Sequence, residues 1–167
     1  PFQILFSKLS KDHLEVSNPG ILLLSKHPVV FLMFLISGIF FFKILNFLKK
    51  NSYFSYLGTF LYILYPYLLG HSFFNLKDIP FLSAWLICTY LSFKIINIYI
   101  DKNFFSLKYV FLLSVLTAFL ISIRISGVLI FLQLFITLII FFLTYSIQKE
   151  KIKSFILTIF FYVFFTI

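Results

Sequence analysis

Residues 109–147 restrict the possible folds of this chain more than any other stretch. They carry a single charged side chain, Arg124, within an otherwise apolar run. A membrane-spanning helix needs about 20 apolar residues, because about 30 Å of hydrocarbon is crossed at about 1.5 Å per residue. The run is too long for one such helix. We therefore expect two helices that are separated at Arg124 and Gly127.

Similar apolar runs recur along the chain. Of the 167 residues, 62% are hydrophobic and 11% are charged, whereas soluble domains are about half apolar and about a quarter charged. We expect an all-α fold: a polytopic transmembrane helical bundle in a single domain, with about five complete spans and a truncated sixth. An outer-membrane barrel is excluded because the runs do not alternate between apolar and polar residues. The spans are predicted at residues 28–48, 53–70, 79–100, 106–123, 127–147 and, truncated, 154–167.

The chain is expected to be a fragment of a longer protein, since it begins with Pro1 and ends inside an apolar run. It has one cysteine, Cys88, so no disulfide can form within it. The net charge of +9 is interpreted as a signal of membrane topology rather than of nucleic-acid binding, because the lysines fall between apolar runs.

Positive residues in the connections predict the orientation, because cytoplasmic loops are enriched in Lys and Arg. If the spans alternate, nine positive residues lie on one side: Lys43, Lys49, Lys50, Lys94, Lys102, Lys108, Lys149, Lys151 and Lys153. Five lie on the other: Lys8, Lys11, Lys26, Lys77 and Arg124. The first side is expected to be cytoplasmic. Residues 1–27 are then an interfacial segment on the outer surface.

A group of polar residues interrupts the apolar sequence after the second predicted span. Within GHSFFNLKDIPFL, residues 70–82, it comprises His71, Asn75, Lys77 and Asp78. A polar loop at the membrane boundary is the simplest explanation, since Asp or Lys costs about 2.5 to 3.5 kcal/mol at the centre of a spanning helix and less near its ends. Asn75 or Asp78 would also cap the third span, with Pro80 in its first turn.

Arg124 is expected on the same outer side as this loop. A guanidinium there can bind a phosphate through two parallel hydrogen bonds. The alternative is that Arg124 lies at the membrane boundary and only extends its guanidinium into the aqueous interface. Gly127 would permit a tight turn or a close approach of helices. Arg124, His71, Lys77 and Asp78 together could hold a lipid-linked phosphate. Lys26 and His27 lie on the same predicted face, where contact with lipid headgroups is the favoured explanation for them.

Three stretches of the chain are distinctive: YPYLLGHSFFNLKDIPFLS at residues 65–83, AFLISIRISGVLI at residues 118–130 and SKHPVVFLMFLISGIFFFKIL at residues 25–45. They resemble bacterial polytopic glycosyltransferases of the GT-C superfamily, in the family related to protein O-mannosyltransferases and to the aminoarabinose transferase of lipid A. The first stretch carries the most specific part of the resemblance. Leu76 stands where the family motif has Pro, and Lys77 and Asp78 remain in place.

The resemblance implies a multi-pass enzyme of the bacterial inner (plasma) membrane. It would transfer a sugar, with inversion, from a polyprenyl-phosphate donor to a protein or lipid acceptor on the extracytoplasmic face. Asp78 would be an auxiliary catalytic residue, and the main base would lie in an outer loop that precedes this chain. Lys77 and Arg124 would neutralise the phosphate, and His71 and Asn75 would bind the substrate.

The expected partners are the lipid-linked sugar donor, membrane lipid and a protein or glycolipid acceptor, with no nucleic acid. No cofactor is certain, and a divalent metal is left open. His13, with Asp12 and Glu15, resembles a metal cluster only loosely. Two other functions remain as alternatives: a multi-span transporter or lipid flippase, which would favour ionisable groups at mid-membrane and two related halves, and a structural membrane subunit.

Overall fold

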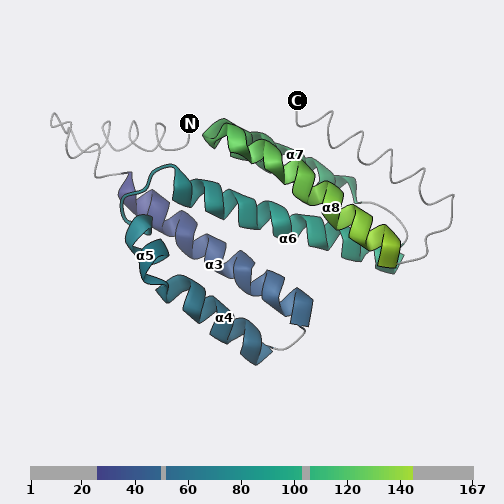
Figure 1. Ribbon diagram of the computed structural model, residues 1–167, viewed down its shortest axis with the longest axis horizontal. Coiled ribbons are helices and arrows are strands. Elements are labelled where there is room, and N and C mark those ends of the chain that lie inside the picture. Colours follow the sequence, from purple (N-terminus) through teal and green to yellow (C-terminus); the bar gives the residue numbers. More distant parts are fainter. Residues whose placement is uncertain (1–25, 50–51, 103–105, 145–167) are drawn as a thin grey trace. The chain divides into compact units, whose positions relative to one another are not determined.

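The computed structural model describes residues 26–49, 52–102 and 106–144 (Figure 1). Every regular element in these ranges is helical and none is a strand, so the all-α prediction is confirmed for them. The described residues fall into two compact units, one that extends to Ser83 and one that starts at Ala84. Most of the predicted interfacial segment 1–27 and the truncated span 154–167 lie outside the described residues.

Two of the predicted spans correspond to long single helices. Helix α3 comprises His27–Lys49 and matches the first predicted span. Helix α6 comprises Asp78–Lys102 and matches the third. In the described part of the chain, these are the two helices long and apolar enough to cross a membrane, over 22 and 23 residues respectively. The remaining helices are shorter.

The second predicted span, residues 53–70, is not one helix. Helix α4 comprises Ser52–Leu64, and helix α5 follows at Pro66–Ser72. Tyr65 between them has φ −58° and ψ 114°, which is not helical. Proline has no N–H to continue a helix, and its ring disfavours the helical conformation in the preceding residue. Pro66 therefore ends α4 at Leu64 and starts α5.

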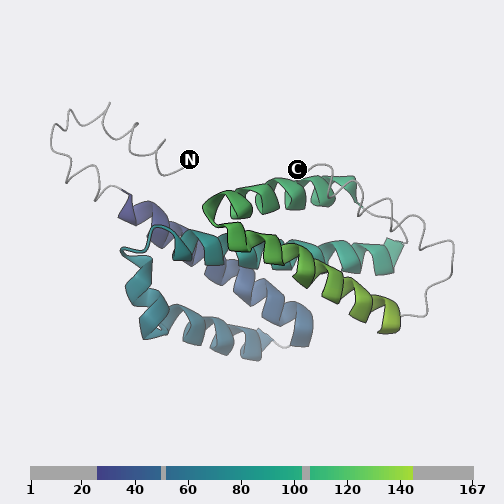
Figure 2. The same ribbon diagram turned by 45° about the horizontal axis from the view of Figure 1, so that its top comes forward.

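Helices α3 and α4 form an antiparallel pair in the first unit, and they lie side by side in Figures 1 and 2. Gly38 of α3 faces Ile63 of α4, and further along α3 Leu45 faces Gly58, which lies earlier in α4. The glycines allow this close approach: a Cβ added at Gly58 would lie 2.5 Å from Leu45 Cδ1. Such small residues are typical of packed membrane helices.

Tyr62 links this pair of helices through both its ring and its hydroxyl. The ring lies 5.5 Å from that of Phe34 and 4.7 Å from that of Phe41. The hydroxyl shares a hydrogen bond of 2.7 Å with the Ser37 hydroxyl, which also donates to the Phe34 carbonyl. The polar atoms between α3 and α4 are thereby satisfied within an apolar contact.

The core of the first unit joins the start of α6 to α3. Its buried residues are Val30, Phe34 and Ile79. The half-buried apolar residues packed against them are Tyr62, Ile63, Leu68, Leu69 and Leu76. Phe31 stacks on Phe73 at a centroid distance of 5.1 Å. These contacts hold the loop between α5 and α6 against the first turns of α3.

The second unit contains the rest of α6, then α7 (Leu107–Ile123), the 3-10 helix η1 (Ile125–Val128) and α8 (Leu129–Thr144). The predicted interruption at Arg124 and Gly127 is confirmed. Polar side chains connect these helices: the Gln133 amide donates to the Thr89 hydroxyl at 2.9 Å, and Cys88 Sγ lies 4.0 Å from Thr117 Oγ1.

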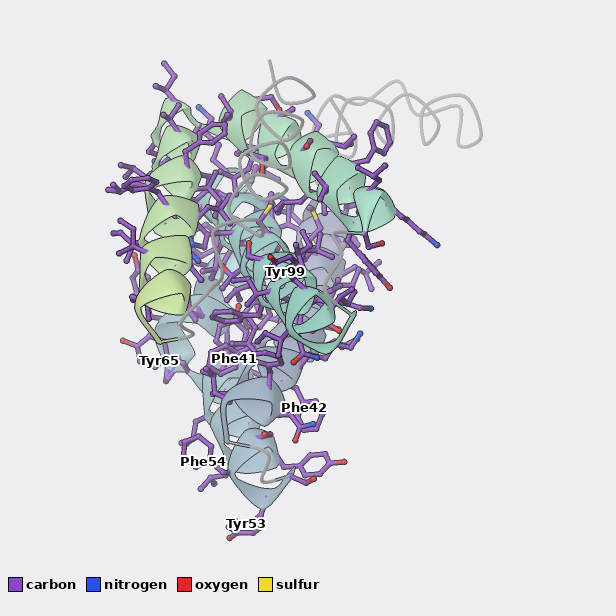
Figure 3. All side chains as sticks on the ribbon, turned by 90° about the vertical axis from the view of Figure 1, so that its right-hand side faces the viewer. Phe41, Phe42, Tyr53, Phe54, Tyr65 and Tyr99 are labelled. Atoms are coloured by element: carbon purple, nitrogen blue, oxygen red, sulfur yellow. The ribbon has the colours of Figure 1, made fainter. Side chains whose placement is uncertain are left out.

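Apolar side chains cover much of the exposed surface, whereas small hydroxyls lie inside. The exposed large hydrophobics include Tyr53 and Phe54, which project away from α4 in Figure 3. The buried polar residues of the described ranges are all serine or threonine: Ser37, Ser55, Ser72, Ser83, Ser92, Ser114 and Thr117. Several bond to a carbonyl one turn earlier, as Ser83 does to Ile79 at 2.8 Å. Large contiguous apolar surfaces are rare on soluble monomers, so this distribution suggests an apolar environment.

Candidate functional site: the loop between α5 and α6

The polar loop begins in the last turn of α5 and ends at the first residue of α6. The amides of Phe73 and Phe74 donate to the carbonyls of Gly70 and His71, each at 3.2 Å. The amide of Asn75 donates to the His71 carbonyl at 2.8 Å. These backbone bonds continue the winding of α5 for one turn past its end. They bring Asn75 close to His71, four residues earlier.

Asn75 is the cap of α6. Its Oδ1 accepts the backbone N–H of Lys77 at 3.2 Å and that of Asp78 at 2.9 Å. These N–H groups have no partner inside the helix, and a side-chain oxygen just before the helix commonly satisfies them. The sequence offered Asn75 or Asp78 for this role, and the structure assigns the backbone contacts to Asn75.

The amide nitrogen of Asn75 joins the two other polar side chains. Nδ2 donates to Asp78 Oδ2 at 2.8 Å and lies 3.0 Å from His71 Nδ1. A primary amide has two N–H donors and two acceptor positions on its oxygen. All four are used here. Asn75 therefore connects a histidine and a carboxylate that the sequence placed in one loop without a link between them.

Two aromatic rings flank His71. The ring of Tyr67 lies 4.3 Å away and that of Phe74 lies 5.0 Å away, by centroid. Both are largely exposed, at 63% and 59%. Neither ring was among the residues predicted for the site, although Tyr67 precedes His71 by four residues and Phe74 follows it by three. That spacing places side chains on one helical face and could have indicated these contacts.

Lys77 and Asp78 are exposed, whereas His71 and Asn75 are half-buried. The carbonyl of Lys77, just before α6, accepts the Phe81 N–H at 3.1 Å and so closes the first turn of the helix. An ammonium, a carboxylate, an amide and an imidazole thus come together within eight residues, at the start of a helix long enough to cross a membrane. This group can bind an oxygen-rich or anionic ligand through charge and hydrogen bonds.

Arg124 lies at the break between α7 and η1, in the second unit. Its backbone is extended, with φ −149° and ψ 137°, and its N–H donates to the Leu120 carbonyl at 3.2 Å. Its own carbonyl accepts the Gly127 N–H at 2.9 Å. A Cβ at the buried Gly127 would lie 2.9 Å from the carbonyl carbon and oxygen of Leu120. The predicted close approach at Gly127 is confirmed, and the grouping of Arg124 with Asp78 stays a prediction.

His27 is the first residue of α3. Its Nδ1 is buried and has no hydrogen-bond partner within the described residues. The described ranges contain no group of three or more His, Cys, Asp or Glu side chains that could hold a metal ion. Asp12, His13 and Glu15 lie outside these ranges, so the loosely predicted metal cluster stays a prediction.

Comparisons of the chain with protein-family models, with curated proteins and with solved structures found no match. The resemblance to GT-C glycosyltransferases therefore stays a prediction. What supports a function is the geometry of the loop itself.

Proposed function

We propose that this chain is part of a polytopic membrane glycosyltransferase. The enzyme transfers a sugar from a polyprenyl-phosphate donor to a protein or lipid acceptor on the extracytoplasmic face of a bacterial inner membrane. The observation that carries the proposal is the hydrogen-bonded group of His71, Asn75 and Asp78 beside Lys77, at the start of α6. The sequence resemblance adds the reaction class.

A multi-pass arrangement is supported by the two long apolar helices and by the exposed apolar side chains. We propose that α4 with α5, α7 and α8 supply further spans. Helices α7 and α8 contain 17 and 16 residues, or about 25 Å each at the helical rise. That length approaches the thickness of the hydrocarbon layer.

The tyrosines agree with this placement. Tyr65 and Tyr67 are exposed near the polar loop, and Tyr53 and Tyr56 are exposed at the far end of α4. Tyrosine is enriched at both membrane–water interfaces, where its ring is in apolar surroundings and its hydroxyl meets water. In this arrangement the polar loop lies at one interface, where a lipid-linked phosphate also lies.

The proposed reaction breaks the bond between the anomeric carbon and the phosphate oxygen and forms a bond from that carbon to the acceptor oxygen. The acceptor proton passes to a base in the longer protein, and polyprenyl phosphate leaves. Lys77 neutralises the charge that develops on the phosphate, because preorganised positive charge at such a position is usually a large part of catalysis. Asp78, held by Asn75, orients the acceptor or the donor sugar.

Transfer of labelled sugar from a polyprenyl-phosphate sugar, measured with the full-length protein in membranes, tests the proposal. Asp78→Asn and Lys77→Gln are expected to lower transfer at least tenfold. Lys108→Gln is the matched control, since Lys108 is exposed at the predicted cytoplasmic side. Unchanged transfer in both loop variants would remove the assigned site. Movement of a labelled polyprenyl lipid across the membrane without transfer would instead favour the flippase alternative.

A further inference from the structure

The orientation of the Asn75 side chain decides the hydrogen bonding of its neighbours. Its Oδ1 faces two backbone N–H groups, those of Lys77 and Asp78. A backbone N–H can only donate, so the amide oxygen and not the nitrogen must face them. The amide nitrogen then has to face Asp78 Oδ2 and His71 Nδ1. If the oxygen and nitrogen of the Asn75 amide were exchanged, the NH2 group would face the two backbone N–H groups, which are also donors. The amide oxygen would face the Asp78 carboxylate, which is also an acceptor.

This orientation sets the protonation of the His71 ring. A neutral imidazole has one N–H nitrogen and one acceptor nitrogen, and its partner determines which is which. Because Asn75 Nδ2 donates to Nδ1, the proton of the ring lies on Nε2. Among the described residues, the side-chain hydrogen bond of His71 is the one at Nδ1. Nε2–H is thereby left to donate to a ligand.

We infer that Asn75 is a positioning residue that holds His71 as the Nε2–H tautomer, so that His71 donates a hydrogen bond to a phosphate oxygen of a polyprenyl phosphate. The choice of ligand rests on the proposed function, and the tautomer does not. A general base would need an unprotonated nitrogen toward the substrate, and here that nitrogen faces Asn75. His71 thus serves as a fixed donor.

The groups around His71 fit this role. The charged groups of the loop are Asp78, which reaches the ring through Asn75, and the exposed Lys77. The Asp78 carboxylate accepts one hydrogen of the Asn75 amide, and the ring accepts the other. Tyr67 and Phe74 limit the rotation of the ring from α5 and from the loop. A preorganised donor of this kind needs no reorganisation when negative charge develops.

Nitrogen NMR of the full-length protein in detergent micelles, with ¹⁵N-labelled histidine near pH 8.5, tests the inference. The wild-type His71 is expected to carry its proton on Nε2. In the exchange variant N75D/D78N, a carboxylate at position 75 still accepts the two backbone N–H groups but faces Nδ1, so the proton is expected to move to Nδ1. Asn75→Ser is the matched control that keeps a cap but cannot hold the ring, and a mixture of tautomers is expected.

A wild-type proton on Nδ1, or an exchange variant that keeps it on Nε2, would overturn the inference. Addition of a polyprenyl monophosphate should shift the Nε2–H resonance of the wild type, and Asn75→Ser should bind that lipid several-fold more weakly. An unmoved resonance in a protein that still transfers sugar contradicts the role of His71 and leaves the proposed function standing. A moved resonance without sugar transfer upholds the inference and removes the proposed function.

Discussion

Asn75 and Asp78 make two hydrogen bonds to each other. The Asn75 oxygen accepts the Asp78 backbone N–H at 2.9 Å, and the Asn75 nitrogen donates to the Asp78 carboxylate at 2.8 Å. One side chain therefore fixes both the first turn of α6 and the position of the carboxylate on it. The start of a membrane-length helix and the candidate site are consequently the same structural element, and a change in one is expected to affect the other.

Replacement of Asn75 separates the cap from the side-chain contacts. Asn75→Ala removes both and is expected to lower the free energy of unfolding by about 0.5 to 2 kcal/mol, the usual cost of a lost cap. Asn75→Ser keeps an oxygen that can accept the Lys77 and Asp78 N–H groups, so most of that stability should return. Unfolding in detergent, followed by circular dichroism, measures the difference. Equal stability of the alanine variant and the wild type would contradict the capping role.

Gly127 and Gly70 form a matched pair for backbone packing. Gly127→Ala places a methyl group 2.9 Å from the backbone carbonyl of Leu120, so the break between α7 and α8 must shift, and we expect a clear loss of thermal stability. A Cβ at Gly70 meets nothing within 4 Å, and Gly70 lies inside α5. Gly70→Ala should therefore stabilise by about 0.4 to 1 kcal/mol. The opposite order of the two melting temperatures would argue against this packing.

The hydroxyl of Tyr62 should contribute modestly to the pairing of α3 and α4. Tyr62→Phe removes the 2.7 Å bond to Ser37, but the Ser37 hydroxyl still donates to the Phe34 carbonyl. The expected loss is about 0.6 kcal/mol, as is typical of hydrogen bonds between membrane helices. Tyr56→Phe is the control: it removes a hydroxyl from an exposed ring and keeps the ring contact with Phe42. A larger loss in the control would contradict this contribution of the Ser37 bond.

The location of features along the chain was easier to predict than their detailed contacts. Helices α3 and α6 and the break at Arg124 follow from long apolar runs and from one isolated charge, which are signals of composition. The division of the second span at Tyr65 depends on the effect of Pro66 on the backbone. The residues on both sides of Pro66 are apolar, so hydrophobicity alone does not mark this break. The hydrogen bond between His71 and Asn75 depends on the backbone turn at Phe73 and Phe74. A pattern of apolar and polar residues does not predict such a turn.

The lone cysteine of this chain makes its proposed topology simple to test. Cys88 is fully buried, so it should react slowly with maleimides and give little background. Lys77→Cys is expected to react with a membrane-impermeant maleimide from the periplasmic side. Lys108→Cys should react only after the inner membrane is opened. Both native lysines are exposed, so a difference between the variants reports the side of the membrane. Labelling of both from the periplasmic side would contradict the alternation of the spans.

Substitutions of His71 distinguish a hydrogen-bond donor from a base in the transfer reaction. Glutamine can place an amide N–H near the position of Nε2, but it cannot take up a proton at neutral pH. His71→Gln is therefore expected to retain a measurable part of the activity. His71→Leu, which fills a similar volume without a donor, should lose about 1.5 to 3 kcal/mol of transition-state stabilisation, the usual worth of a hydrogen bond to a charged group.

The loss in His71→Leu should fall on kcat/KM for the polyprenyl-phosphate sugar and not on the stability of the fold. Asn75→Ser provides the intermediate case, since its imidazole is present but not held in one tautomer. The expected order of activity is wild type, then Asn75→Ser and His71→Gln, then His71→Leu. A glutamine variant as inactive as the leucine variant, with both folded, would contradict the donor role and favour His71 as a base. The proton would then have to be on Nδ1 during the reaction, and Asn75 would have to turn away from the ring.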